Sequence, residues 1–138
     1  MCGIAGIYNL APGPPPGQDT LQAMTASFRY RGPDEEGYYT DDQVGLGIRR
    51  LAIVDIEHGQ QPMFSDGRDL VSVCNGEIYN HLDLRARLEA RGHPFRTRCD
   101  VEVIIPMYRH YGLDGIQHFN GQFGFALYDR ARRRLVLA

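Results

Sequence analysis

Residues 1–10, MCGIAGIYNL, place a cysteine directly behind the initiator methionine and follow it with a short apolar segment. The apolar run from Ile4 to Tyr8, interrupted by a glycine, predicts a buried strand at the very start of the chain. Removal of Met1 would leave Cys2 with both a thiol and a free α-amino group. The first strand would then carry a chemically reactive chain end.

A thiol attacks as its thiolate, and a cysteine with the ordinary pKa of about 8.5 needs a base near neutral pH. No histidine lies near Cys2 in the sequence. An α-amino group has a pKa of about 7.7–8.0 and can be that base, as the N-terminal amine is for threonine nucleophiles. Gly3, which has no Cβ, would let a substrate approach closely. The alternative is that Cys2 is inert, as free cysteines commonly are.

Composition excludes several classes of function. The chain has 138 residues, 43% of them hydrophobic and 23% charged, which is typical of one globular domain. All 15 basic residues are arginines, which excludes a lysine-containing phosphate loop, a Schiff-base lysine and a lysine base. This arginine bias indicates a GC-rich bacterial genome. The net charge of −2 argues against a nucleic-acid or anionic membrane surface.

The sequence also indicates a cytoplasmic protein without a metal site. It has no CxxC pair, no HExxH motif, no segment of transmembrane length and no signal peptide. Cys2, Cys74 and Cys99 are far apart in the sequence, which predicts neither structural zinc nor a disulfide framework. We expect Cys74 and Cys99 to be small buried residues.

The order of strand and helix patterns predicts an α/β or α+β domain. Beyond the first strand, the predicted strands are 38–40 (YYT), 44–54 (VGLGIRRLAIV), 70–76 (LVSVCNG) and a hairpin of 123–129 with 134–138. The run at 44–54 is too apolar to have a side that faces solvent.

Three helices are expected from apolar positions at helical spacing. The first runs from Asp19 to Tyr30, the second begins at Ile78 and is capped by Gly92, and the third begins at Asp100. Their expected apolar faces are Leu21, Met24 and Phe28; Ile78, Leu82, Ala86 and Leu88; and Val103, Met107 and Tyr111.

Six stretches carry a family resemblance: MCGIAGIYNL (1–10), RGPDEEG (31–37), RRLAIVDIEHGQQPM (49–63), CNGEIYNH (74–81), CDVEVI (99–104) and FNGQFGFALYD (119–129). In this order they resemble the N-terminal glutaminase of glutamine-hydrolysing asparagine synthetases, a class II glutamine amidotransferase domain of the N-terminal-nucleophile hydrolase type. The resemblance covers essentially the whole chain. It implies an α+β fold, a four-layer αββα sandwich with two antiparallel sheets between helical layers.

The resemblance implies that Cys2, exposed once Met1 is removed, is the nucleophile that attacks the side-chain amide of glutamine. It assigns the oxyanion hole to the side-chain amide of Asn75 and the backbone N–H of Gly76. Two fixed donors suit a tetrahedral intermediate, which carries charge on the former carbonyl oxygen. An isolated Asn-Gly pair is typical of a hairpin turn. Here it ends an apolar strand and precedes a helix, which favours a loop at the site.

The implied substrate-binding residues are Arg50, Leu51, Ile53, Val54, Asn75, Gly76, Glu77 and Asp100. Arg50 would bind the α-carboxylate of glutamine, for which a planar guanidinium is well shaped. Asp100 would bind the α-ammonium group, and a helix N-cap is the alternative for this residue. Glu77 could almost equally be an ordinary solvated glutamate. Arg49, the neighbour of Arg50, could be only a solvated charge.

The expected reaction is hydrolysis of L-glutamine to glutamate and ammonia through a thioester on Cys2, for ATP-dependent amidation of aspartate. No cofactor and no metal are expected in this chain, because ATP and Mg²⁺ belong to the synthetase domain that follows in the family. That domain is absent, so residues 1–138 are interpreted as an incomplete, C-terminally truncated glutaminase domain, inactive alone. The family also suggests a homodimer for the full-length protein.

Two other functions stay open. The same chemistry could supply ammonia to another acceptor, as in phosphoribosyl- and glucosamine-type amidotransferases, although RLAIVD (50–55) and NGEIYNH (75–81) look closer to the synthetase branch. The domain could also be a catalytically silent glutamine-binding or interaction module. One departure from the family pattern lies beside the site, where Arg98 stands at a position that is often a small residue.

Overall fold

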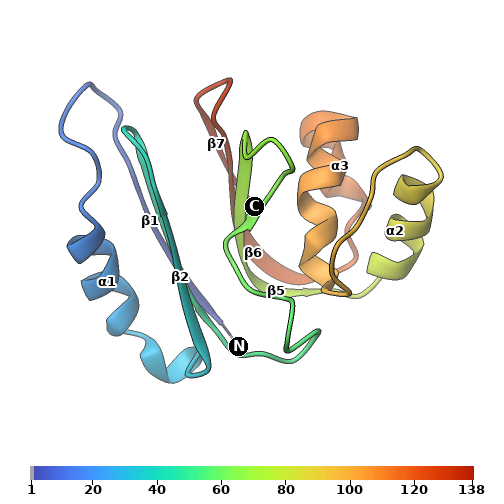
Figure 1. The fold of residues 1–138 in the computed structure, drawn as a ribbon, viewed down its shortest axis with the longest axis horizontal. Helices are drawn as coiled ribbons and strands as arrows, with labels where there is room; N and C mark the ends of the chain where they lie inside the picture. Colours follow the sequence, from blue (N-terminus) through green and yellow to red (C-terminus); the bar gives the residue numbers. More distant parts are fainter. Residues whose placement is uncertain (1) are drawn as a thin grey trace.

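The computed structural model describes residues 2–138, which form four layers (Figure 1). One antiparallel sheet contains β1 (Gly3–Tyr8), β2 (Glu35–Thr40) and β3 (Val44–Arg50), in the order β1-β3-β2. The second contains β4 (Met63–Phe64), β5 (Leu70–Ile78), β6 (Gly121–Asp129) and β7 (Arg134–Leu137), in that order. The two sheets face each other, which confirms the predicted α+β four-layer sandwich.

The outer layers are helical. The helix α1 (Gln18–Ala26) covers the first sheet, and α2 (His81–Glu89) and α3 (Ile104–Tyr111) cover the second (Figure 1). Short 3₁₀ helices span Arg29–Arg31, Asp100–Val103 and Gly112–His118. No helix in the described part of the chain is long and apolar enough to cross a membrane.

The central strand β3 is buried along its whole length, as its apolar sequence predicted. Two of its glycines face α1: a Cβ on Gly45 would lie 2.7 Å from Leu21 Cδ1, and one on Gly47 would lie 2.8 Å from Thr25 Cγ2. The missing side chains let the helix pack closely on the sheet. Leu21 is fully buried there, which stabilises the fold by about 1.5–3 kcal/mol.

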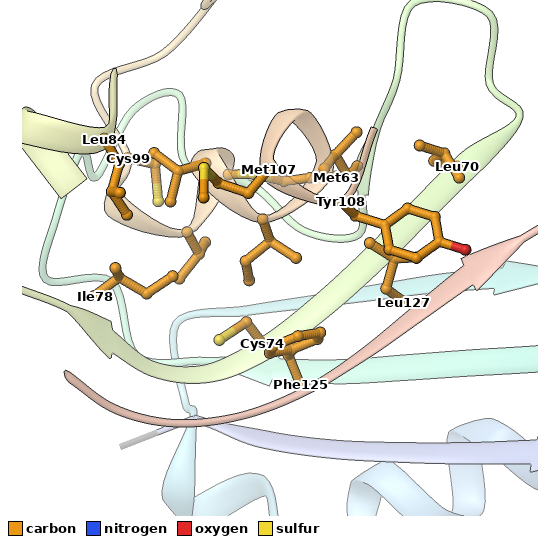
Figure 2. Packing of buried hydrophobic residues seen from close by; sticks show 14 of the residues in the cluster. Met63, Leu70, Cys74, Ile78, Leu84, Cys99, Met107, Tyr108, Phe125 and Leu127 are labelled. Atoms are coloured by element: carbon orange, nitrogen blue, oxygen red, sulfur yellow. The ribbon is translucent and has the colours of Figure 1, made fainter. Parts of the chain in front are cut away.

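Alternate residues of β5 belong to two apolar cores because side chains alternate across a strand. Val71 and Val73 face the first sheet and pack in the core between the sheets. Cys74 belongs to the outer core, beneath α2 and α3. Figure 2 shows this outer core, in which Met107 of α3 lies across from Cys74 and Phe125 of the second sheet. The strand β5 is therefore held on both faces.

Two predicted helices differ in extent from the observed ones. The first ends at Ala26 rather than Tyr30, and a 3₁₀ turn follows. The second begins at His81 rather than Ile78, because β5 continues through Ile78. Its buried positions are Leu84 and Leu88, whereas Leu82 is 68% exposed. The predicted apolar stripe of this helix was therefore right at Leu88 and wrong at Leu82 and at Ala86, which is also exposed.

Other boundaries agree with the sequence. Gly92 has a φ of 84°, and the N–H groups of Gly92 and His93 bond the carbonyls of Glu89 and Leu88. This is the glycine-terminated helix end that was predicted. The third helical segment begins at Asp100 as a 3₁₀ turn and continues as α3. The hairpin of β6 and β7 is confirmed.

The predicted strand at 44–54 is too long. The strand β3 ends at Arg50, and the next residue, Leu51, donates its N–H to the sulfur of Cys2 at 3.3 Å. The Arg50 guanidinium then binds the carbonyls of Val54 and Asp55, which hold the following residues as a loop. A buried arginine thus redirects a sequence that is apolar enough to continue the strand.

Candidate active site

A pocket opens at one end of the sandwich, lined by residues of both sheets and of the loops beside them. The predicted site residues that line it are Cys2, Arg50, Leu51, Ile53, Val54, Gly76, Glu77 and Asp100. They come from the residue before β1, from β3 and β5, from the loop after β3 and from the 3₁₀ turn before α3. Asn75 is the predicted residue that does not line the pocket.

Cys2 lies immediately before β1 and is buried, with 9% exposure. Its Sγ accepts the Leu51 N–H at 3.3 Å and lies 3.7 Å from the Leu51 carbonyl oxygen. The Nε–H of Arg31 donates to the Cys2 carbonyl at 3.0 Å. The thiol and the backbone beside it are therefore both held in place. The predicted loss of Met1 lies outside the described residues.

Gly3 has a different role from the predicted one. A Cβ at this position would lie 2.4 Å from Cδ2 of Phe28. The space beside Gly3 is therefore filled by the Phe28 ring, and the glycine permits packing rather than the approach of a substrate.

The Asn-Gly pair lies inside β5, opposite Gly124 and Phe123 of β6. Both the hairpin turn and the predicted loop are therefore incorrect. Gly76 has a φ of 148°, and a Cβ there would lie 2.2 Å from the Gln122 carbonyl oxygen. Only glycine fits this backbone.

Asn75 lies on the face of β5 that turns toward the first sheet, two residues after Val73. Its Oδ1 is buried and has no hydrogen-bond partner within residues 2–138. A buried polar atom without a partner costs about 1–3 kcal/mol. Such an atom at the edge of a pocket is a feature that ligand binding could use.

Arg50 is 3% exposed, and its terminal nitrogens are fully engaged. Nη1 donates to Glu35 Oε2 at 2.7 Å and to the Ile56 carbonyl at 3.3 Å. Nη2 donates to the carbonyls of Val54 and Asp55, at 3.0 and 2.9 Å. A substrate carboxylate would therefore have to use Nε–H or displace one of these acceptors, of which Glu35 carries the charge.

Arg49 is not the solvated charge that the sequence suggested. It is 7% exposed and forms an ion pair with Glu36 on the neighbouring strand β2. It lies on β3 next to Arg50, and alternation along the strand directs the two side chains to opposite faces. Arg49 therefore faces away from the pocket.

Asp100 is a buried carboxylate, with 5% exposure. Its Oδ2 accepts the Ile78 N–H at 2.8 Å, and its Oδ1 accepts the Cys99 thiol at 3.7 Å. It makes no side-chain cap bond at the start of its 3₁₀ turn, so the N-cap alternative is excluded. No salt bridge within residues 2–138 includes it. Asp100 is thus a buried carboxyl group without an ion-pair partner among these residues.

The other two thiols are buried, as predicted. Burial, with the nearby charge of Asp100, raises the pKa of the Cys99 thiol to about 12. Burial also raises the pKa of the Cys74 thiol well above its usual range. Both stay protonated at neutral pH and are poor nucleophiles, which leaves Cys2 as the thiol suited to chemistry.

Sequence reasoning missed several residues of the site. Gln61 and Gln122 line the pocket, Glu35 pairs with Arg50, and Arg31 holds the carbonyl of Cys2. Gln61 stands in the stretch that carried the resemblance, but two adjacent glutamines give no signal of which one turns inward. Residues 2–138 contain no group of three or more His, Cys, Asp or Glu side chains suited to a metal ion.

The chain belongs to the family of glutamine amidotransferase domains, whose sequence model matches residues 1–138. Within that family it is homologous to the glutaminase domains of asparagine synthetases. Asparagine synthetase [glutamine-hydrolyzing] 1 of Bacillus subtilis (strain 168) is 38% identical over 132 residues, which are 94% of this chain and 21% of that protein. Asparagine synthetase [glutamine-hydrolyzing] 2 of the same organism is 40% identical, over 99% of this chain and 18% of that protein.

A relative from another organism gives the same result. Asparagine synthetase B [glutamine-hydrolyzing] of Escherichia coli (strain K12) is 37% identical over 94% of this chain and 23% of that protein. The chain thus spans about a fifth of the length of these relatives.

A solved structure shows the same fold. The glutamine phosphoribosylpyrophosphate amidotransferase of B. subtilis, complexed with ADP and GMP, matches with a TM-score of 0.72. The match has 17% sequence identity and covers 94% of this chain and 35% of that chain. The shared architecture is that of the N-terminal-nucleophile hydrolases.

Proposed function

We propose that this domain hydrolyses the side-chain amide of L-glutamine through a thioester on Cys2 and releases glutamate and ammonia. The observation that carries the proposal is a single pocket lined by three groups: the Cys2 thiol, the backbone of Gly76, whose conformation only glycine can adopt, and the buried carboxylate of Asp100, which has no ion-pair partner in the described residues. Each of these groups matches one requirement of amide hydrolysis: a nucleophile, a backbone donor and a counter-charge for an amino acid.

In the proposed first step, Sγ of Cys2 attacks the side-chain carbonyl carbon of glutamine, and the π electrons move onto the oxygen. The thiol proton passes to the α-amino group of Cys2, which requires the loss of Met1. That proton then reaches the leaving nitrogen, the C–N bond breaks and ammonia departs. Water hydrolyses the resulting thioester to glutamate and restores the thiol.

The negative oxygen of each tetrahedral intermediate would be stabilised by the Gly76 N–H and the Asn75 side-chain amide. Preset donors of this kind lower the barrier because they need no reorganisation as charge develops. The place of Gly76 in the lining of the pocket, together with Cys2, supports this role. Asn75 lies on the face of β5 that is turned toward the first sheet, and its Nδ2–H would be the second donor.

The substrate's amino-acid end would be held by opposite charges. Asp100 would pair with the α-ammonium group, which gives the buried carboxylate the cation that it lacks. The α-carboxylate would meet Arg50, where it takes the place of Glu35 or uses the remaining Nε–H. Leu51, Ile53 and Val54 would line the chain of the substrate, and Glu77 would close the opposite side.

The ammonia would be used for ATP-dependent amidation of aspartate in the full-length protein, with ATP and Mg²⁺ bound outside this chain. The identities of 37–40% to curated asparagine synthetases support this acceptor. The phosphoribosylpyrophosphate amidotransferase, at 17% identity, shares the fold and gives no comparable support for its own acceptor.

The test is Cys2→Ala in the full-length protein, with Cys74→Ala as the matched control. We expect Cys2→Ala to abolish glutamine hydrolysis and to leave synthesis from added ammonia unchanged, because only this thiol forms the thioester. Cys74→Ala should keep both activities. Intact mass of the active wild-type protein should show the loss of one methionine. Appreciable glutaminase in Cys2→Ala, or active protein that retains Met1, would exclude the mechanism.

A further inference from the structure

Gln61 lies at the pocket and contacts both sheets. We propose that Gln61 is a positioning residue for the glutaminase reaction, because it fixes the strand that carries Asn75 and Gly76 relative to the sheet that carries Cys2. The inference rests on the proposed function and concerns a residue with no assigned role in it.

The first part of the argument is the register of β4 and β5. Met63 pairs with Ser72 and Phe64 with Val71, so the same antiparallel register places Gln61 opposite Cys74. At this position the side chain replaces the backbone pairing. Its Oε1 accepts the Cys74 N–H at 2.7 Å, and its Nε2 donates to the Cys74 carbonyl at 3.2 Å. Both backbone groups immediately before Asn75 are therefore held by one side chain.

The second part is the contact of the Gln61 backbone with the first sheet. A Cβ on Gly37 of β2 would overlap the Gln61 carbonyl oxygen, so the two backbones touch there. Gly37 pairs with Ile48 of β3, and β3 pairs with β1, whose first residue follows Cys2. Gln61 thus connects the two sheets directly, with its main chain on one and its side-chain amide on the other.

The consequence concerns geometry rather than substrate affinity. An oxyanion hole works only when its donors lie within about 0.5 Å of the productive position. Loss of the amide would let β5 shift near Asn75 relative to Cys2, whereas Asp100 bonds the far end of this strand, at Ile78, and the Cys99 thiol. The turnover number should therefore fall while the KM for glutamine changes little.

The experiment compares Gln61→Met with Gln60→Met in the full-length protein. Methionine preserves length and flexibility but removes both hydrogen bonds, and Gln60 is an exposed neighbour whose amide bonds only the Glu57 carbonyl. We expect Gln61→Met to lower kcat for glutamine hydrolysis by about 10–100-fold at nearly constant KM, and Gln60→Met to behave as wild type. Alkylation of Cys2 by iodoacetamide, which forms no oxyanion, should keep its wild-type rate.

A second variant covers the case in which Gln61→Met does not fold. Gln61→Glu keeps the acceptor for the Cys74 N–H but turns an oxygen toward the Cys74 carbonyl. As the pH falls, the introduced carboxyl is protonated and regains a donor, so kcat relative to wild type should recover. An unchanged kcat in both variants would overturn the positioning role alone. Loss of Cys2 alkylation together with kcat would also overturn it, in favour of general disruption. A wild-type protein without glutaminase activity would overturn the proposed function itself.

Discussion

Gly76 is the residue at which the backbone of the pocket is most constrained. It combines a φ of 148° with a position where a Cβ would meet the backbone of Gln122 and Phe123 on the paired strand. Neither atom belongs to a flexible side chain that could move aside. Any side chain at position 76 would therefore strain the strand pair that carries the proposed oxyanion donors.

We predict that Gly76→Ala destabilises the fold by at least about 2 kcal/mol, from backbone strain and overpacking together. Gly124→Ala is the matched control, because Gly124 pairs with the neighbouring residue Asn75 and a Cβ there would meet open space. Urea unfolding of both variants checks the difference. Equal midpoints for the two variants would show that the conformation at Gly76 is not required.

Most of the individual residues that line the pocket could be predicted from the sequence. Cys2, Arg50, Gly76, Glu77 and Asp100 were all predicted for the site, and all line it. Arg49 was predicted to be solvated but is buried, because the sequence around two adjacent arginines does not show which face of the sheet each side chain takes. Gln61 could not be found, since its role depends on the register between β4 and β5, which no local pattern encodes.

Among the elements, the contact between α3 and the β6–β7 hairpin depends on one buried carboxylate. Asp129 is 1% exposed, and it accepts the Tyr108 hydroxyl at 3.1 Å and the Arg132 backbone N–H at 3.0 Å. Burial tends to raise the pKa of Asp129, but these hydrogen bonds and the Arg132 charge outweigh it and hold the pKa below its usual range. Burial raises the pKa of Tyr108, and its hydrogen bond to Asp129 and the charge of Asp129 add to the rise.

We predict that Asp129→Asn lowers stability at neutral pH by about 1–3 kcal/mol. The folded pKa of Asp129 is depressed, so its contribution is fully present above the unfolded pKa of about 3.9 and is lost as the pH falls through the folded value. The difference in the free energy of unfolding between wild type and Asp129→Asn should therefore become smaller as the pH falls. The exposed Asp114→Asn is the control, and thermal melts across this pH range give the measurement. A gap that stays constant into acid would mean that ionisation of Asp129 does not contribute.

The elements themselves were predicted where one pattern dominates. The fully apolar β3 and the glycine end of α2 followed from the sequence, because burial on both faces and a left-handed cap each require particular residues. The first residue of α2 and the positions of its buried face did not follow from the sequence, since Ile78 is equally suited to end a strand or begin a helix. The end of β3 depends on the bonds of Arg50 to the loop carbonyls, which are tertiary contacts.

In the whole molecule, the site exists only because the two sheets meet. Cys2 immediately precedes the first strand of the first sheet, Arg50 ends the central strand of that sheet, Gly76 comes from the second sheet, and Asp100 comes from the 3₁₀ turn outside it. No single element contains the pocket, so a ligand that binds there should report on the stability of the entire sandwich. The unpaired Asp100 makes this coupling measurable.

We predict that glutamine raises the melting temperature of the Cys2→Ala full-length protein, in which it cannot be consumed, and that Asp100→Asn removes most of the shift. At a concentration about 100 times the dissociation constant, binding stabilises the folded state by about 2.7 kcal/mol. Removal of one partner of a buried charge pair costs about 2–5 kcal/mol of affinity, which leaves at most about 1 kcal/mol of this stabilisation. Without glutamine, Asp100→Asn should not be less stable, because the substitution removes a buried charge that has no cation while its amide oxygen can still accept the Ile78 N–H. Asp114→Asn serves again as control and should keep the full shift. An undiminished glutamine shift in Asp100→Asn would show that the α-ammonium group is bound elsewhere.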